Sequence, residues 1–201
     1  MSLTDVSVKQ PQLADLGPVL KEWTRIIGEY CAVMEDDVPY WHNERADVSI
    51  LAGAVWRRGG ICLEEPATRK ARGRSKRPGR ADLLFALDGR YYVGEAKRTG
   101  ATLGSCEAVQ RVQNCLESAC QDVRRYQEDA DVLRLGIAFV VPHLVESRVD
   151  CCASLVKGFL DSLSDIAMDF AAWTFPKIEP AVHTWKRYLH PGVVLLGKIQ
   201  G

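Results

Sequence analysis

Two carboxylates and a lysine stand close together near the middle of this 201-residue chain, at Asp82, Glu95 and Lys97. Carboxylate oxygens are ligands that Mg²⁺ and Mn²⁺ prefer in proteins. A lysine beside such an ion can hold a water or a phosphate oxygen. The three side chains would therefore suit metal-assisted hydrolysis of a phosphate ester, provided that the fold brings them onto one surface.

A short hairpin is expected to bring these side chains together. An Asp-Gly pair at 88–89 separates two apolar, β-favouring runs, and this is the strongest short-range signal for a two-residue type I′ turn. With that pair as the turn, Leu87 faces Arg90, and the same register sets Asp82 directly opposite Glu95. Opposed side chains share a face with Cβ atoms about 5 Å apart, and the period of two along a strand adds the lysine to that face.

The rest of that face is apolar, which favours a metal site over solvated charges. It also carries Leu84, Tyr91 and Val93, and such a face is expected to be buried. Opposed like charges destabilise a strand pair, and a divalent cation is the simplest reason for two acids to face each other. The alternative is that all three charges are solvated on the outer face of an edge hairpin.

The pattern of Asp82 followed, after a short hairpin, by Glu95-Ala96-Lys97 resembles the PD-(D/E)XK nuclease superfamily. The resemblance implies that Asp82 and Glu95 bind Mg²⁺ or Mn²⁺, with the backbone carbonyl of Ala96 as a further ligand. It also implies that Lys97 helps to activate the water that attacks the phosphodiester bond.

A fourth candidate, Glu44, comes from a helix expected to begin at the N-cap residue Asn43 and to run to about residue 58. Its apolar face includes Val48, Leu51 and Val55, and Glu44 falls on the same face. A carboxylate that faces a core is costly unless it is paired or bound to a metal. The resemblance implies that a glutamate on the first core helix joins the metal site or its water shell, and Glu44 fits this role. The alternative is a first-turn glutamate that favours the helix dipole.

A strongly basic segment at 69–80 leads directly into Asp82. It contains no acidic residue, two glycines and seven basic residues: Arg69, Lys70, Arg72, Arg74, Lys76, Arg77 and Arg80. We expect a loop that becomes ordered on binding rather than a regular element. Clustered cations give non-specific, salt-sensitive affinity for phosphate backbones. A nuclear-localisation-like run or a solubilising loop is the alternative.

The chain is expected to form a single α/β domain over residues 1–201. The resemblance implies a restriction-endonuclease-like fold, with a mixed central β-sheet flanked by α-helices and a core at about residues 43–141. An extra N-terminal helix at 12–34, after a polar lead-in, and a C-terminal helix and strand extension at 150–201 would pack on that core. The other expected elements are a strand at 61–63, a turn at 99–104, a helix at 105–128 capped by Ser105, a strand at 133–141 bounded by Pro142, a helix at 151–170 and a strand at 193–199.

Composition narrows the class of protein. The formal net charge is zero, so any affinity for nucleic acid must come from local clustering. Neither a signal-peptide pattern nor a stretch of about 18 apolar residues is present, which predicts a cytoplasmic protein with no membrane partner. The seven cysteines form no CxxC pair, and there is no GxSxG turn or Gly-rich phosphate loop. Metal-assisted hydrolysis is the enzyme class that remains.

The expected function is that of a Mg²⁺- or Mn²⁺-dependent deoxyribonuclease, acting in phage defence, restriction or repair. DNA is the expected partner, and RNA is not excluded. One alternative is a nuclease-like module that binds nucleic acid or takes part in assembly, with weak or no catalysis. Another is a toxin-type nuclease controlled by a regulatory protein partner. A homodimer formed through the aromatic stripe of the N-terminal helix is a further alternative.

Overall fold

The computed structural model describes residues 3–72, 75–126, 131–177 and 188–200, and among these it leaves out the side chains of 69–72 and 75–78. A mixed eight-stranded β-sheet forms the centre of the molecule. Only the central β6–β7 pair is parallel among the described pairs, and the others are antiparallel. In spatial order the strands are β1 (Leu3–Val8), β8 (Phe170–Phe175), β10 (Val193–Gln200), β7 (Val132–Val145), β6 (Arg90–Thr102), β5 (Leu83–Leu87) and β2 (Ile61–Glu64), with β9 (Tyr188–Leu189) paired to β7.

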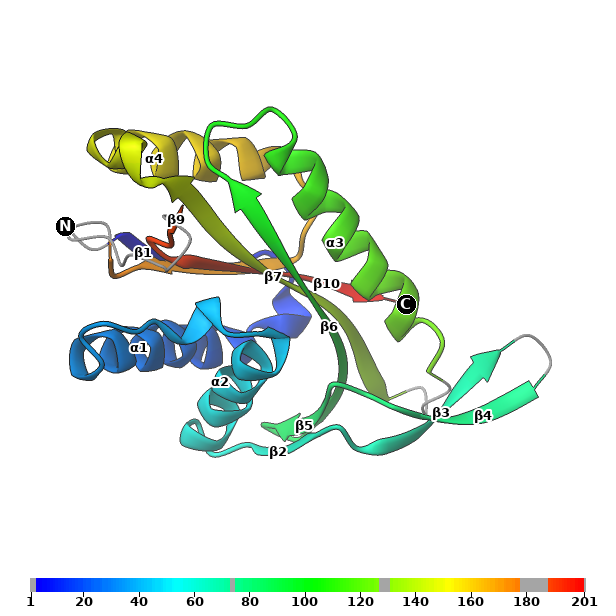
Figure 1. Cartoon of the computed structure of the whole chain (residues 1–201). Helices are drawn as coiled ribbons and strands as arrows, with labels where there is room; N and C mark the ends of the chain where they lie inside the picture. The colour runs from blue at the N-terminus through cyan, green and yellow to red at the C-terminus, as the bar shows by residue number, and fades with distance from the viewer. Residues whose placement is uncertain (1–2, 73–74, 127–130, 178–187, 201) are drawn as a thin grey trace.

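Helices cover both faces of this sheet, so the protein is an α/β protein with a mixed sheet between helical layers (Figure 1). On one face lie α1 (Leu16–Val33) and α2 (Glu44–Arg57), and on the other lie α3 (Ala108–Val123) and α4 (Cys152–Ser162). Short 3-10 helices span Pro11–Leu13, Pro39–Trp41, Glu146–Cys151 and Leu163–Asp165. None of the helices in the described ranges has the length and apolar character needed to cross a membrane.

The alternation of side chains along β7 divides the core into two layers. Leu135 and Ile137 pack with Trp23 and the other apolar residues of α1 and α2. Ala138 and Val140 belong instead to the cluster formed with α3 and α4. This strand is buried on both faces, which explains its continuous apolar sequence.

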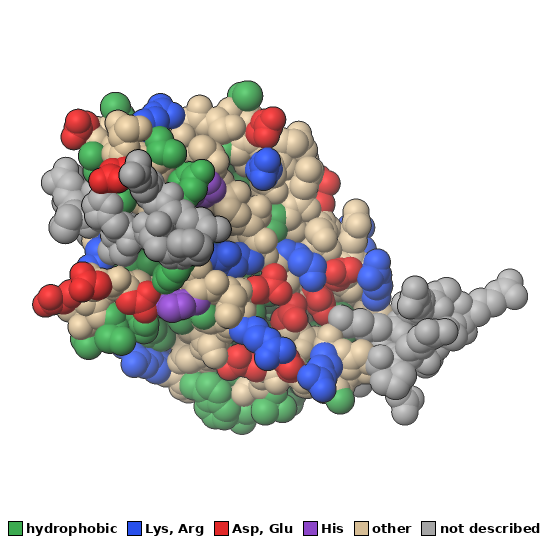
Figure 2. Space-filling model, in the orientation of Figure 1, with side chains coloured by type: hydrophobic (Ala, Val, Ile, Leu, Met, Phe, Trp, Pro, Cys, Tyr) green, Lys and Arg blue, Asp and Glu red, His purple; other side chains and the backbone are tan. Residues whose placement is uncertain are grey.

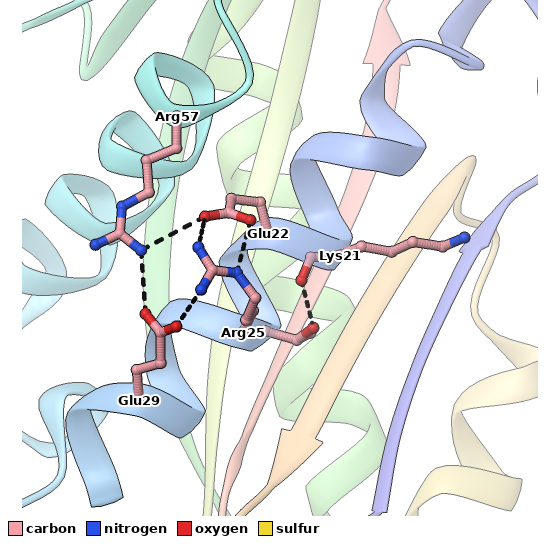
Figure 3. A network of polar contacts seen from close by, with 6 residues as sticks. Lys21, Glu22, Arg25, Glu29 and Arg57 are labelled. Atoms are coloured by element: carbon pink, nitrogen blue, oxygen red, sulfur yellow. Dashed lines mark hydrogen bonds and ion pairs between the residues drawn. The ribbon is translucent and has the colours of Figure 1, made fainter. Parts of the chain in front are cut away.

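A network of ion pairs joins α1 to α2 on the surface (Figure 3). Arg57 of α2 lies 3.1 Å from Glu29 and 3.5 Å from Glu22, both on α1. Arg25 lies between the same two acids and pairs with each of them. These contacts add to the apolar packing that holds α2, the helix that begins with Glu44, against α1.

The predicted β5–β6 hairpin is confirmed in both turn type and register. Asp88 and Gly89 have positive φ values of 47° and 78°, as a type I′ turn requires at both central positions. Leu87 pairs with Arg90, and the ladder continues to Leu83 opposite Gly94. The predicted helix behind Asn43 is confirmed as well, since the Asn43 side chain accepts a hydrogen bond from the backbone N–H of Ala46.

Three strands were missed near the ends of the chain: β1, β8 and the two-residue β9. The expected polar lead-in is wrong, because Leu3–Val8 forms β1 and pairs with β8 at the sheet edge. The helix expected at 151–170 is too long, since α4 ends at Ser162 and Phe170 begins β8. Each strand is stabilised mainly by pairing with a partner distant in sequence, which local periodicity does not reveal.

The two central strands are longer than expected. β6 continues to Thr102, so the turn expected at 99–104 is limited to residues 103–104, and β7 continues through Pro142 to Val145. Proline is tolerated at this point because the neighbouring β10 ladder has already ended at Val140. The helix expected at 105–128 is shorter too, since α3 spans Ala108–Val123 and Glu107, rather than Ser105, is its N-cap residue.

Candidate functional site

Asp82 lies directly before β5, one residue beyond the last pair between β5 and β6. The ladder ends at Leu83 opposite Gly94, so the expected direct pairing of Asp82 with Glu95 does not form. The backbone N–H of Ala96 instead donates to Asp82 Oδ2 at 2.7 Å. The aspartate side chain thus replaces the missing strand partner and lies beside the backbone of β6.

The carbonyl of Ala96 faces the same side as Asp82. In a β-ladder, the N–H and C=O groups of one residue point toward the same neighbouring strand. Since the N–H of Ala96 meets Asp82, its carbonyl points to that side too, past the last described β5–β6 pair. An oxygen atom of the backbone is therefore available next to the aspartate.

Glu95 is a buried carboxylate, with only 3 % of its surface exposed. The hydroxyl of Tyr126 donates to its Oε1, and the ammonium of Lys97 lies 3.8 Å from its Oε2. A buried carboxylate is tolerated only when hydrogen bonds or cations offset its desolvation. The surroundings of Glu95 supply both kinds of partner.

Lys97 is held between two acids and is only 33 % exposed at its side chain. Its Nζ lies 3.1 Å from Asp122 Oδ2, closer than it lies to Glu95. Burial lowers the pKa of Lys97, but the hydrogen bond to Asp122 and the nearby negative charges outweigh it, so the pKa is raised overall. The lysine therefore stays cationic at neutral pH, which suits orienting a water or a phosphate rather than removing a proton.

Burial raises the pKa of Asp82 from its usual 3.8 to about 6. The hydrogen bond from Ala96 and the charge of Lys97 act in the opposite direction, whereas the negative charges of Glu95 and Glu44 add to the increase. A carboxylate in this state gains stability from any additional cation placed beside it.

Glu44 lines the same open pocket as Asp82, at the first turn of α2. The pocket has a volume of about 580 Å³, and its other lining residues are Arg45, Val48, Ser49, Glu64 and Glu65. Glu44 is half-buried, whereas Val48 and Leu51 on the expected apolar face are buried. The structure thus brings together Asp82 and Glu44, which stand far apart in the sequence.

Two further acids of this pocket, Glu64 and Glu65, were not predicted as site residues, although they follow the first predicted strand directly. Glu65 is paired with Arg45 at 2.5 Å and with Arg80 at 3.0 Å. The hydroxyl of Ser49 donates to Glu64 at 3.1 Å. Figure 2 shows acidic side chains gathered between basic ones on this face of the molecule.

Asp122, near the end of α3, was also missed as a site residue. Tyr126, just after this helix, is one of the polar residues expected either at the groove, as the resemblance implies, or on a solvated helix face, and its hydroxyl meets Glu95. The helix approaches the sheet closely at Gly136, where an added Cβ would lie 2.8 Å from the Cα of Cys120. Gly136 is the β7 partner of Glu95. A glycine in a predicted buried strand is the one sequence signal for such a close approach, but it does not say which helix residues meet the site.

The basic segment is a β-hairpin rather than the expected loop. β3 (Ala67–Arg72) and β4 (Ser75–Arg80) pair over their whole length as a separate two-stranded sheet. This hairpin projects from the body of the protein beside the β5–β6 end of the main sheet (Figure 1).

Most of the predicted nucleic-acid-binding side chains lie outside the described residues: Arg69, Lys70, Arg72, Arg74, Lys76 and Arg77. Arg80 is described and exposed, and its guanidinium pairs with Glu65. At the base of the hairpin, Ala81 N–H donates to the Pro66 carbonyl and Glu65 N–H to the Asp82 carbonyl, both at 3.2 Å. These bonds connect the hairpin directly to the chain segment that carries Asp82.

The oxygen atoms of Asp82, Glu95 and Ala96 are of the type that a hard divalent cation prefers. In the described part of the chain, no group of three or more His, Cys, Asp or Glu side chains is arranged to hold a metal ion. Mg²⁺ is usually bound through one or two carboxylates plus waters and substrate oxygens. The carboxylates of Asp82 and Glu95 and the carbonyl of Ala96 are the groups here that could supply such oxygen ligands.

Comparison with known proteins does not assign the chain to a family. A scan against protein-family models and searches among curated proteins and solved structures find no match. The chemical role of the site therefore follows from its own residues.

Proposed function

We propose that this protein is a Mg²⁺- or Mn²⁺-dependent phosphodiesterase that cleaves DNA. The observation that carries the proposal is the meeting of Asp82, Glu95 and Lys97 at the end of the β5–β6 ladder, next to an open acidic pocket. Buried acids that exceed the nearby cations provide a place for a divalent ion. The basic hairpin beside them provides a place for a nucleic acid.

The order of elements around the site supports a restriction-endonuclease-like fold. In the main sheet and its helical layer, a strand (β2), a hairpin (β5–β6), a helix (α3) and a further strand (β7) follow in chain order, with the β3–β4 hairpin inserted after β2, and β7 lies parallel to β6. This order is typical of a mixed sheet flanked by helices, the architecture that the resemblance to PD-(D/E)XK nucleases implies. The N-terminal helix α1 and the segment after β7 add to this core on both faces.

Each candidate residue has a distinct role in the proposed reaction. Asp82, Glu95 and the carbonyl of Ala96 would hold the ion, and Glu44 would bind waters around it from across the pocket. When bound, the ion would lower the pKa of a water and neutralise charge on the scissile phosphate. The ammonium of Lys97, kept cationic by its acidic neighbours, would orient the attacking water and stabilise the developing negative charge.

The β3–β4 hairpin is the proposed nucleic-acid-binding element. Seven of the basic residues lie at 69–80 in a chain of zero net charge, so the positive potential is concentrated on this arm. Phosphate contacts of this kind fix the position of a nucleic acid without reading its sequence. The arm leads into Asp82 within two residues of its last strand position, Arg80.

The proposal is tested by incubating the purified protein with supercoiled plasmid, linear duplex and single-stranded DNA, in Mg²⁺, in Mn²⁺ and in EDTA. Cleavage should require the metal. In Glu95→Ala and Lys97→Ala cleavage should fall about 10²- to 10³-fold or more, while DNA binding measured in EDTA persists. Glu107→Ala and Lys157→Ala, which alter residues on other parts of the surface, serve as matched controls and should cleave normally.

Full activity in Glu95→Ala or Lys97→Ala would refute the assignment of the site. If the wild-type protein binds DNA in a salt-sensitive manner but cleaves none of the substrates, the nuclease proposal fails and the binding-module alternative takes its place.

A further inference from the structure

Tyr126 connects the acidic site to the base of the basic hairpin. Its ring is almost completely buried, at 2 % exposure, and packs with Ala81, Val93 and Val123. Its hydroxyl lies 2.6 Å from the backbone carbonyl of Arg80 and also donates to Glu95 Oε1. One buried hydroxyl thus contacts both the last residue of β4 and a candidate metal ligand.

These contacts restrict the orientation of the Glu95 carboxylate. Tyr126 holds one of its oxygens, and Lys97 approaches the other at 3.8 Å. A buried acceptor that loses its donor bears the full cost of desolvation. The carboxylate is therefore held in one orientation, instead of sampling several as an exposed glutamate does.

We propose that Tyr126 is a positioning residue that orients Glu95 to bind a divalent cation. Through its contact with the Arg80 carbonyl, it also links the orientation of Glu95 to the last residue of the β3–β4 hairpin. The inference rests on the proposed metal-binding role of Glu95. Removing a hydrogen bond that orients a metal ligand, from a residue that does not itself contact the metal, lowers metal affinity or activity about 10- to 100-fold. The hydroxyl of Tyr126 has the position for such an effect because it contacts the ligand and not the open pocket.

The chain offers a matched control in Tyr92, which lies on the same strand as Glu95. Tyr92 is fully buried, and its hydroxyl donates to Asp15 Oδ2 at 2.6 Å. It belongs to the core layer of α1 and α2, on the sheet face away from Tyr126. Tyr92→Phe therefore removes the same kind of bond to a carboxylate, away from the candidate site.

The test compares wild type, Tyr126→Phe, Tyr92→Phe and Glu95→Ala in three measurements. Mn²⁺ binding is titrated by calorimetry without nucleic acid, oligonucleotide binding is measured by anisotropy in EDTA, and cleavage kinetics are measured last. In Tyr126→Phe the Kd for Mn²⁺ should rise about 10- to 100-fold. Oligonucleotide affinity in EDTA should stay within about twofold of wild type, and kcat should fall with little change in KM. Tyr92→Phe should match wild type in all three measurements.

A second variant separates positioning from folding. Replacing Tyr126 by p-aminophenylalanine keeps the ring and a hydrogen-bond donor, and should keep the Mn²⁺ affinity near that of wild type. Equal Mn²⁺ affinity in Tyr126→Phe and Tyr92→Phe would overturn the proposal, and so would the absence of Glu95-dependent Mn²⁺ binding in wild type. If Mn²⁺ binding follows the expected order but no DNA is cleaved, the positioning role stands and the nuclease proposal fails.

Discussion

Strand β6 carries charged residues on both of its faces, and the two clusters behave differently. On the α3 face, Glu95 and Lys97 meet Asp122 and Tyr126. On the α2 face, Arg98 meets the buried Asp47. The two clusters occupy neighbouring positions on one strand, so their surroundings rather than their position along the sheet distinguish them.

The α2-face cluster is closed. Arg98 Nε donates to Asp47 Oδ2 at 3.1 Å, and its Nη2 donates to the carbonyls of Tyr40 and Trp41 at 2.8 and 3.2 Å. Asp47 is 1 % exposed. Asp47 and Arg98 neutralise each other's charge, and Arg98 also donates hydrogen bonds to backbone carbonyls. This arrangement suits a structural role in attaching α2 to β6.

The α3-face cluster is open by comparison. Lys97 lies among Asp82, Glu95 and Asp122, and Arg125 also pairs with Asp122 at 2.9 Å, so three acids meet two cations. Asp82 also borders a pocket that further acids line. A buried charge cluster thus becomes a candidate binding site when its own partners do not neutralise it and when solvent can reach it.

The largest effect is expected on DNA cleavage, which should depend on the open cluster and not on the closed one. Asp82→Asn removes a negative charge but keeps a carbonyl oxygen that can accept the hydrogen bond from Ala96. DNA cleavage should fall about 10²- to 10³-fold, with a thermal melting temperature near that of wild type. Plasmid cleavage and a thermal melt check both points, and a variant that cleaves normally would remove Asp82 from the site.

The second prediction concerns stability in the closed cluster. Asp47→Ala leaves Arg98 partly buried without its acid, and breaking a buried ion pair in this way costs about 3–5 kcal/mol. The lower end is expected because the Arg98 side chain is 25 % exposed. Urea denaturation at about pH 8, above the raised Asp47 pKa of about 7 so that the pair is charged, measures the loss, and the folded variant should bind Mn²⁺ like wild type. A loss below about 1 kcal/mol would show that the pair is no more than a surface salt bridge.

The third prediction is a pH dependence of cation binding at the open cluster. The raised pKa of Asp82, about 6, means that the aspartate becomes protonated as the pH falls through that value. Because a cation competes with the proton, Mn²⁺ affinity should decrease about tenfold for each pH unit below the pKa. Calorimetric titration between pH 5 and 8 would detect this, and Asp82→Asn should lose the dependence. A flat profile in wild type would contradict it.

The fourth prediction is a pH dependence of stability at the closed cluster. Burial raises the pKa of Asp47 from its usual 3.8 to about 7, although Arg98 acts to lower it. A group whose pKa is raised on folding contributes stability that is fully present below the unfolded value and is lost as the pH rises through the folded value. The free energy of unfolding contributed by Asp47 should therefore decline between about pH 4 and 7. Asp47→Asn should flatten this part of the urea-denaturation profile, and an unchanged slope would argue against it.

The smallest effect is expected at the surface network between α1 and α2. Arg57 is half-exposed, as is its partner Glu29. Exposed ion pairs contribute about 0.2–1 kcal/mol and are screened by salt. Arg57→Ala should therefore lower the free energy of unfolding by less than about 1 kcal/mol, with cleavage unchanged. A larger loss would show that this network, rather than the Asp47–Arg98 pair, holds α2 in place.

The parts of the site that were predictable depend on local geometry. The Asp-Gly turn at 88–89 determines the β5–β6 register, and this is sufficient to bring Asp82 close to the Glu95-Lys97 segment. The N-cap Asn43 likewise determines where α2 begins and where Glu44 stands. In each case a few adjacent residues dictate the backbone, because their φ and ψ preferences and capping bonds act within one turn.

The residues that surround these acids could not be predicted from local sequence. Tyr126 reaches Glu95 from 31 positions away, and Arg98 reaches Asp47 from 51. Such contacts depend on how closely α3 and α2 pack on the sheet, as at Gly136, and no local preference encodes that distance. The hairpin and the placement of its charged residues therefore follow from local sequence, whereas the packing of the helices on the sheet sets which cluster is neutralised and which retains an excess of acids.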